Sequence, residues 1–257
     1  MSESTRERFD LSDKVAIVTG GSKGIGAAIA RGLAEFGAKV VVSSRKQEAI
    51  DQVVGALKSD GLEAKAVACH VGDDQQVQNL VDQTVAAYGG VDILVNNAAT
   101  NPVFGPAVMT DGGAFDKIIG INLKAPFELA KKVFPILQER GGGSIINISS
   151  IGGLHPEPML GIYSVSKAAL ISLTKVLASE WGPAKIRVNA ICPGLVKTKF
   201  SRALWENEEI LKRFTDELPL RRIANPEEIA PLAVFLASEA ASYCTGSAYT
   251  VDGGHTI

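Results

Sequence analysis

The 257-residue sequence has few cysteines, few aromatic residues and no excess of either charge. Its three cysteines, Cys69, Cys192 and Cys244, are too few and too scattered for a disulfide framework, a CxxC redox pair or a zinc site, so we expect a reducing compartment and no metal. Lysine and arginine total 26 against 28 acidic residues, and this net charge of −2 provides no positive field for a nucleic-acid partner.

Long apolar runs are also missing. Residues 1–10 are polar and mixed in charge, unlike a signal peptide, and no later segment offers about 20 uninterrupted apolar residues. We therefore expect a cytoplasmic protein with no membrane partner. Because the sequence has no repeat, linker or low-complexity tract, it predicts a single domain over residues 1–257.

The sequence does contain a regular alternation of short, β-branched apolar runs with longer stretches of helical period. The runs that predict strands are residues 15–19, 40–42, 64–69, 93–95, 144–148, 186–191 and 248–251. Strands that alternate with helices form a parallel sheet covered on both faces, so the predicted fold class is α/β, a Rossmann-type doubly wound sheet of seven strands. Pro126 and Pro135 predict a kink or a break in the helical stretch 115–140.

A glycine-rich segment, Thr19-Gly20-Gly21-Ser22-Lys23-Gly24-Ile25-Gly26, stands between the first strand and the first helix. Glycine lets the backbone turn tightly, and a helix N-terminus offers unpaired N–H groups and the positive end of its dipole to a pyrophosphate. In this context the segment predicts a dinucleotide site, although its GxxxGxG spacing differs from the common GxGxxG. The expected cofactor contacts here are Gly20, Ser22, Lys23, Gly24, Ile25 and Gly26.

The end of the second strand predicts which dinucleotide is bound. An acidic side chain there would hold the ribose hydroxyls of NAD, but the segment Ser43-Ser44-Arg45-Lys46 contains none. Arg45 can instead pair with the 2′-phosphate of NADP, and Lys23 can reach the same region. We expect NADP(H), with Ser44, Arg45 and Lys46 among its contacts. The competing interpretation is that the cations are ordinary solvated charges.

Tyr163 and Lys167 stand four residues apart in Tyr163-Ser164-Val165-Ser166-Lys167. On a helix such a pair lies on one face, with about 5–6 Å between Cβ atoms, so the ammonium can favour ionisation of the phenol. Tyr163 is therefore a candidate general acid. Ser149-Ser150 ends the fifth strand, at the edge where open α/β sheets bind ligands, and a hydroxyl there can hold a substrate oxygen. A surface tyrosine and lysine on an amphipathic helix would show the same spacing.

Together these motifs resemble the classical short-chain dehydrogenase/reductase family over nearly the whole chain. The matching segments are the glycine-rich segment, Asn96-Asn97-Ala98-Ala99, Ile121-Asn122, Ile148-Ser149-Ser150, Tyr163 with Lys167, and Pro193-Gly194. The resemblance implies that Tyr163 gives and takes the proton, and that Lys167 binds the nicotinamide ribose and lowers the pKa of the phenol. It also implies that Ser150 orients the carbonyl, because the family usually places its serine thirteen positions before the tyrosine.

Further roles follow from the same resemblance. Asn122 would join a water relay to Lys167, and Pro193-Gly194 would line the nicotinamide pocket. His70 stands where the family commonly has an aspartate that contacts adenine. A neutral imidazole can also bond adenine, or His70 is a structural histidine and the backbone of Val71 serves. The remaining cofactor contacts that the resemblance implies are Asn96, Ala98, Val196 and Thr198.

Within the family, the pattern is closest to the NADP(H)-dependent carbonyl/retinal reductase branch. The similar segments are residues 40–47, 69–72, 97–99 with 101–102, and 200–205. That branch ends in a peroxisomal tripeptide, whereas this sequence ends His255-Thr256-Ile257, so only the cofactor preference is carried over. The resemblance predicts an NADP(H)-dependent oxidoreductase that reduces a ketone or aldehyde, or oxidises the alcohol.

Three other functions stay open. A 3-oxoacyl-thioester reductase would need a basic entrance for an acidic carrier protein, to which Lys197, Lys199 and Arg202 can contribute. A sugar or polyol dehydrogenase of the same family would have a more polar pocket. A dinucleotide-binding regulator without turnover would not need Ser150, Tyr163, Lys167 and Asn122 together.

Two segments are candidates for the substrate pocket, residues 154–160 and 196–214. The second contains apolar residues that would suit a lid over a moderately apolar ketone or aldehyde, namely Phe200, Leu204, Trp205, Ile210, Leu211 and Phe214. Members of the family are usually tetramers, so the resemblance implies a homotetramer. Residues 118–134 and 170–177 suit packing between subunits, and equally suit packing on the sheet.

Overall fold

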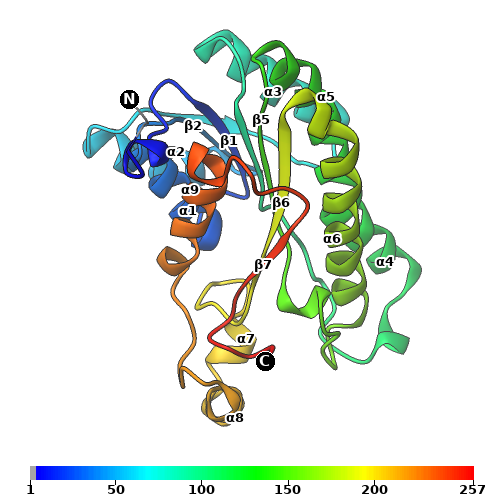
Figure 1. The fold of residues 1–257 in the computed structure, drawn as a ribbon. Helices are drawn as coiled ribbons and strands as arrows, with labels where there is room; N and C mark the ends of the chain where they lie inside the picture. Colours follow the sequence, from blue (N-terminus) through cyan, green and yellow to red (C-terminus); the bar gives the residue numbers. More distant parts are fainter. Residues whose placement is uncertain (1–3) are drawn as a thin grey trace.

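The structure, a computed structural model, describes residues 4–257 and their side chains except those of Ala203 and Ile210, so the expected lid role of Ile210 lies outside the described part. Parallel strands form one seven-stranded sheet in the order β3-β2-β1-β4-β5-β6-β7 (Figure 1). The strands are β1 (Val15–Thr19), β2 (Lys39–Ser44), β3 (Ala64–Ala68), β4 (Ile93–Asn96), β5 (Gly143–Ile148), β6 (Ile186–Pro193) and β7 (Ala248–Val251). The predicted Rossmann-type sheet is therefore confirmed, and each strand overlaps the run that predicted it.

Helices cover both faces of the sheet, because each buries one apolar stripe against it. One face is covered by α1 (Gly24–Glu35), α2 (Gln47–Ser59) and α9 (Ala230–Ala237). The other is covered by α3 (Asp74–Tyr88), α5 (Ala125–Glu139) and α6 (Gly161–Trp181). α4 (Gly112–Ile119) leads towards α5, while α7 (Arg202–Trp205) and α8 (Glu208–Glu217) lie beyond the end of the sheet (Figure 1).

Among the described residues 4–257, one helical stretch, residues 161–184, is long and apolar enough to cross a membrane by length and composition, with a mean hydropathy of 1.2. The stretch comprises α6 and the turn after it. Its buried residues Leu170, Ile171 and Leu177 belong to the core on the sheet. Central helices of α/β domains have this composition because one face is fully buried, so packing on the sheet accounts for it.

The predicted break near Pro126 takes the form of a π-helical turn. Gly120–Lys124 forms this turn between α4 and α5, and Pro126 lies in the first turn of α5, where a missing N–H leaves no helical hydrogen bond unmade. Pro135 lies inside α5 and does not end it. The π turn contains the buried Asn122, whose side chain reaches Ser166 of α6.

A bidentate ion pair fastens the chain just before β4. The carboxylate of Asp92, 6% exposed, accepts hydrogen bonds from Arg140 at 2.8 and 2.9 Å and from the backbone N–H of Val15 at 2.8 Å. Asp92 thereby joins the beginnings of β1 and β4, the adjacent strands at which the strand order reverses. Ligands of open α/β sheets bind at the carboxyl ends of such a pair, so Asp92 helps to fix the frame of the site.

Replacing Arg140 tests this ion pair. Arg140→Leu should lower the free energy of unfolding by about 2–3 kcal/mol, because it leaves a buried carboxylate without its counter-ion. Arg31→Leu is the matched control, since Arg31 pairs with Glu35 and Asp60 at the surface, and it should cost less than about 1 kcal/mol. Urea denaturation of both variants measures the difference, and equal losses would contradict the role given to Asp92.

Candidate active site

The loop after β1 is held by the loop after β4. The side-chain amide of Asn97 donates to the carbonyl oxygens of Thr19 at 2.9 Å and Gly20 at 3.2 Å. The Thr19 hydroxyl accepts from the N–H groups of Asn97 and Ala98 at 3.0 and 3.2 Å. Gly20 has a φ of +65°, and a methyl group at Gly26 would lie 2.6 Å from the Gly20 carbonyl oxygen. The loop therefore requires glycine at both positions.

This loop leads into the N-terminus of α1. Lys23 is the N-cap residue, and its side chain caps none of the first N–H groups, which stay available to an anion together with the positive end of the helix dipole. A methyl group at Gly24 would lie 3.2 Å from the side chain of Thr198, so two segments with predicted cofactor contacts meet here. Ser22 and Ile25 are half-buried beside them.

Three cations lie along the same edge of the sheet. Ser44 ends β2, the exposed Arg45 and Lys46 follow it, and the exposed Lys23 follows the neighbouring strand β1. Within residues 4–257, the side chains of these three cations have no hydrogen bond or ion pair to the protein. Cations that lack a protein partner suit a phosphate group, as the sequence predicted for NADP.

His70 follows β3 and has a structural task. The ring Nδ1 of His70 accepts a hydrogen bond from the backbone N–H of Gly72 at 3.2 Å. The backbone N–H of His70 donates to the side-chain oxygen of Gln76 at 2.9 Å. An accepting Nδ1 places the proton of the neutral ring on Nε2, whose N–H remains available to a ligand. Both interpretations of His70 are therefore compatible with this geometry, and Val71 lies half-buried beside it.

Tyr163 and Lys167 lie on the part of α6 that faces the end of β5. The Lys167 ammonium, on a residue 3% exposed, donates to the carbonyl oxygen of Ile148 at 2.8 Å and lies 5.6 Å from the centre of the Tyr163 ring. The buried Ser149 donates to the carbonyl oxygen of Lys167 at 2.9 Å. The hydroxyl of Ser150 instead hydrogen-bonds Tyr163. The structure therefore places Ser150 beside the phenol and gives Ser149 a structural task.

Burial decides the protonation of this pair. Burial raises the pKa of Tyr163 to about 12, although the hydrogen bond to Ser150 lowers it. Burial also lowers the pKa of Lys167 to about 8. Burial is thus the largest influence on the pKa of the phenol in this structure, and the lowering expected from Lys167 stays a prediction. At neutral pH the phenol keeps its proton.

Asn122 is fully buried, and its carboxamide is occupied by protein partners. Oδ1 accepts from the N–H of Thr100 at 2.8 Å, and Nδ2 donates to the carbonyl of Thr100 and the hydroxyl of Ser166 at 3.0 Å each. The Ser166 hydroxyl donates in turn to the carbonyl of Tyr163 at 2.7 Å. The side chain of Asn122 therefore positions the backbone of Tyr163 through Ser166, and the water relay to Lys167 stays a prediction. No motif had indicated Ser166 as the link.

The side chain of Asn96 is buried, so a cofactor contact at this residue would have to come from its backbone. It is 4% exposed and donates to Asn147 at 3.0 Å and to the carbonyl of Pro126 at 3.4 Å. Asn147 donates to the hydroxyl of Thr174 at 2.9 Å, so the network joins β4, β5 and α6. Asn97, the next residue, is the one that contacts the glycine-rich loop.

The loop after β6 completes the site. Pro193 and Val196 are buried, and a methyl group at Gly194 would lie 2.9 Å from the Cα of Asp252. Phe200, 56% exposed, places its ring 5.9 Å from that of Tyr163. An apolar side chain therefore lies beside the phenol of Tyr163.

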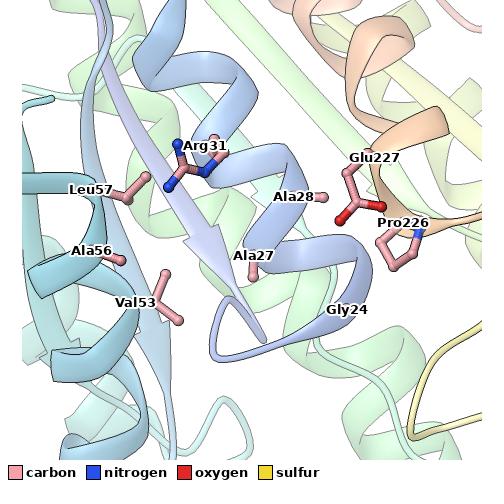
Figure 2. Close-up of a pocket in the computed structure, with 9 residues that line it drawn as sticks. All are labelled: Gly24, Ala27, Ala28, Arg31, Val53, Ala56, Leu57, Pro226 and Glu227. Atoms are coloured by element: carbon pink, nitrogen blue, oxygen red, sulfur yellow. The ribbon is translucent and has the colours of Figure 1, made fainter. Parts of the chain in front are cut away.

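A shallow cavity lies outside this site, between α1, α2 and the turn Pro226–Glu228 (Figure 2). Its volume is about 260 Å³, and Gly24 is the one predicted cofactor contact among the residues that line it. Arg31, another lining residue, is paired with Asp60 at 2.8 Å and so has a protein partner. The cavity contains none of the residues gathered around Tyr163.

The arrangement fits a dinucleotide. The uncapped N-terminus of α1 and the unpaired cations Lys23 and Arg45 suit phosphates, and the buried ammonium of Lys167 gives one hydrogen bond to the protein, which leaves donors for ribose hydroxyls. Fold and site together define a protein of the Rossmann dinucleotide-binding class, with a Ser-Tyr-Lys group at the edge of its sheet.

Comparison with known proteins defines the family. Residues 20–256 match a family model described as enoyl-(acyl carrier protein) reductase. Dehydrogenase/reductase SDR family member 4 from pig (Sus scrofa) is 48% identical over 253 residues, which cover 98% of this chain and 91% of the pig protein. The human protein of the same name is 48% identical over 247 residues, covering 96% and 89%.

Solved structures agree with this result. Gluconate 5-dehydrogenase from Burkholderia cenocepacia, in complex with NADP and tartrate, has a TM-score of 0.93 at 32% identity and matches over 97% of both chains. A 7α-hydroxysteroid dehydrogenase in complex with NADH and 7-oxo glycochenodeoxycholic acid has a TM-score of 0.93 at 35% identity, over 99% of this chain and 98% of the other. The chain belongs to the short-chain dehydrogenase/reductase family, whose members are NAD(P)(H)-dependent oxidoreductases acting on carbonyl and alcohol groups.

The buried Lys167 makes stability depend on pH. Its pKa is about 8 in the folded protein against an ordinary value of 10.5, so between these limits the unfolded chain holds a proton that the folded chain has released. Stability then rises with pH. Relative to Lys167→Met, the wild type should gain on the order of 2 kcal/mol in free energy of unfolding between about pH 8 and pH 10.

Urea denaturation at a series of pH values measures this gain. The raised pKa of Tyr163 acts in the opposite direction, but only above its ordinary value of 10.0, where the unfolded phenol ionises first. The Tyr163→Phe variant should therefore show the same rise in free energy of unfolding between about pH 8 and pH 10 as the wild type. If the difference in free energy of unfolding between wild type and Lys167→Met stayed constant from about pH 8 to pH 10, Lys167 would have its ordinary pKa in the folded protein.

Proposed function

We propose that this protein is an NADP(H)-dependent reductase of ketones or aldehydes, and catalyst of the reverse oxidation of alcohols, with Tyr163 as the general acid. One observation carries the proposal: a half-buried, protonated phenol, bonded to Ser150 and adjacent to Lys167, lies at the carboxyl edge of the sheet beside an uncapped helix N-terminus. Membership of the family supports the broader statement that the protein is an oxidoreductase for carbonyl and alcohol groups.

Residues along the carboxyl edge would hold the nucleotide. The N-terminus of α1 would take the pyrophosphate, and Lys23, Arg45 and Lys46 would take the 2′-phosphate that distinguishes NADP from NAD. The ammonium of Lys167 would donate to the ribose next to the nicotinamide. When bound, the reduced nucleotide supplies a hydride to the carbonyl carbon of the substrate.

The protein supplies the proton and the geometry. Ser150 accepts a hydrogen bond from the N–H of Gly152 at 3.1 Å, which fixes its oxygen and leaves its own hydrogen to donate. Ser150 and Tyr163 would both donate to the substrate carbonyl oxygen, where negative charge develops, and Tyr163 would pass its proton to that oxygen. A phenol whose pKa is about 12 holds this proton at neutral pH, which favours the reductive direction.

The surroundings of Tyr163 support an apolar carbonyl compound as substrate. Phe200 faces the phenol ring, so an apolar group on the substrate would find an apolar wall there. Of the three cations that could form a basic entrance for an acyl carrier protein, Arg202 is paired with Glu206 at 2.5 Å and Lys197 lies over the ring of Trp205, which leaves only Lys199 exposed and without a partner among the described residues. These contacts favour a small carbonyl compound over an acidic carrier protein, and Phe200 favours it over a polyol.

Removing the phenolic hydroxyl tests the mechanism. Tyr163→Phe keeps the ring that packs on Phe200 but has no proton to give, so kcat for carbonyl reduction should fall by about 10³-fold. The dissociation constant for NADPH, measured by fluorescence titration, should change by less than about twofold, because the hydroxyl faces the substrate. Tyr88→Phe, on α3, is the control and should leave both values unchanged. Near-normal turnover by Tyr163→Phe would assign the acid elsewhere.

The choice of nucleotide rests on exposed charge. Arg45→Ala should raise the KM for NADPH by about tenfold and leave the KM for NADH unchanged, because the lost hydrogen bonds go to the 2′-phosphate alone. Lys58→Ala, which removes another exposed cation from α2, is the matched control. A spectrophotometric screen of ketones, aldehydes and acyl thioesters with both nucleotides provides the measurement. Wild-type rates with NADH equal to those with NADPH would contradict the role of Arg45, and no oxidation of either nucleotide would favour a regulator.

For the assembly we propose a cytoplasmic homotetramer. Apolar side chains are exposed on α4 and α6, including Phe115, Val165 and Val176, on the same side of the sheet. Covering these apolar side chains with a second copy of the chain would remove them from water and stabilise the assembly.

A further inference from the structure

Trp205 closes the turn that follows β6. Its indole N–H donates to the carbonyl oxygen of Thr198 at 2.8 Å, and the ammonium of Lys197 lies 5.4 Å from the centre of the indole ring. Trp205 is the last residue of the short helix α7, so this hydrogen bond joins the end of α7 to the start of the turn before it. A four-residue helix has little stability of its own, and tertiary contacts must hold it in place.

The turn itself is cross-linked by hydroxyl groups. The Ser201 hydroxyl donates to the carbonyl of Val196 at 2.5 Å and lies 3.0 Å from the hydroxyl of Thr198. It approaches the Thr198 carbonyl only to 3.3 Å, so the indole is the better-placed donor to that oxygen. At the base of the turn, the N–H of Lys197 donates to the carbonyl of Ala224 at 2.8 Å.

This turn connects the two halves of the site. On one side, Thr198 packs against Gly24 at the N-terminus of α1, where the proposed function puts the nucleotide. On the other side, Phe200 lies against the ring of Tyr163, where the proposed function puts the substrate. Only Lys199 separates these two residues in the chain, so a shift of the turn would displace both contacts together.

We propose that Trp205 is a positioning residue that fixes this turn, so that Thr198 meets the nucleotide and Phe200 meets the substrate at the same time. The inference rests on the proposed function and concerns binding rather than proton transfer. Loss of the indole N–H would free the carbonyl of Thr198, loosen α7 and weaken binding at both contacts. Of the proposed proton donors, Ser150 lies in the turn after β5 and Tyr163 belongs to α6, so both would stay in place.

Trp205→Phe is the direct test, because phenylalanine keeps an aromatic ring and removes the N–H. The KM and the dissociation constant for the nucleotide should rise about three- to tenfold, the loss expected for one neutral hydrogen bond. The rise should be the same for NADPH and NADH, unlike that of Arg45→Ala. The kcat at saturation should stay within about threefold of wild type, and selectivity for bulky over small apolar carbonyl compounds should fall.

The second tryptophan of the sequence provides the matched control. Trp181 ends α6 and packs on Phe134 with 4.7 Å between ring centres, on the other side of the molecule from the turn. Trp181→Phe should leave both KM values unchanged. It also leaves Trp205 as the sole tryptophan, so the fluorescence of this variant reports on the turn directly. Saturating NADP⁺ should change its emission and its quenching by acrylamide, and should change neither in Trp205→Phe.

The outcomes separate the two proposals. Wild-type nucleotide affinity in folded Trp205→Phe would overturn this inference, and so would an equal loss of affinity in Trp181→Phe. Emission of Trp205 that does not respond to NADP⁺ would overturn it as well, even if Trp205→Phe failed to fold. If the wild type bound no nucleotide and reduced no carbonyl compound, the proposed function would fall together with it. If the wild type were active and the Trp205→Phe variant had wild-type nucleotide affinity, the role of Trp205 would be wrong and the proposed function would stand.

Discussion

Two hydrogen bonds that run in opposite directions hold α6 against the end of β5. The hydroxyl of Ser149 donates to the carbonyl of Lys167, and the ammonium of Lys167 donates to the carbonyl of Ile148. The ammonium therefore stays buried although no described acidic residue forms an ion pair with it. Such burial disfavours the charged form, so the position of α6 on the strand explains the lowered pKa of the lysine.

The loops at the carboxyl edge of the sheet are held by the same type of contact, a side chain bonded to the backbone of another segment. Thr19 and Asn97 tie the loops after β1 and β4 at the point where the strand order reverses. Asn122 and Ser166 tie the π turn to the backbone of Tyr163. Neutral hydrogen bonds of this kind are weak singly, but together they fix the loops before a ligand arrives.

The sequence predicted the sheet well, because β-branched runs between helical stretches depend on local pattern alone. It was less informative where a result depends on which way one residue faces. Asn96 and Asn97 are adjacent, and the register of the end of β4 decides that the first points into the sheet and the second towards the glycine-rich loop. The helical pattern around Pro126 indicated an interruption, but a π turn has no distinct pattern of its own.

The protonation of Tyr163 was beyond sequence reasoning for a different reason. Spacing shows that an ammonium is near, but only the packed structure shows how much water is excluded from both groups. The contact between the rings of Phe200 and Tyr163 joins segments far apart in the chain. The bond from Trp205 to Thr198 depends on how a short helix folds back on its own loop. Neither contact leaves a periodic signal in the sequence.

The cations Lys23, Arg45 and Lys46 stand apart from all these networks, since they are exposed and bonded to nothing else in the described part of the protein. Substituting them would leave the sheet and the contacts among Ser150, Tyr163 and Lys167 untouched. Under the proposed function, the choice of coenzyme and the transfer of the proton therefore depend on separate parts of the molecule. A change of preference between NADP and NAD, which differ in the 2′-phosphate, would then require substitutions at the surface alone and none near Tyr163.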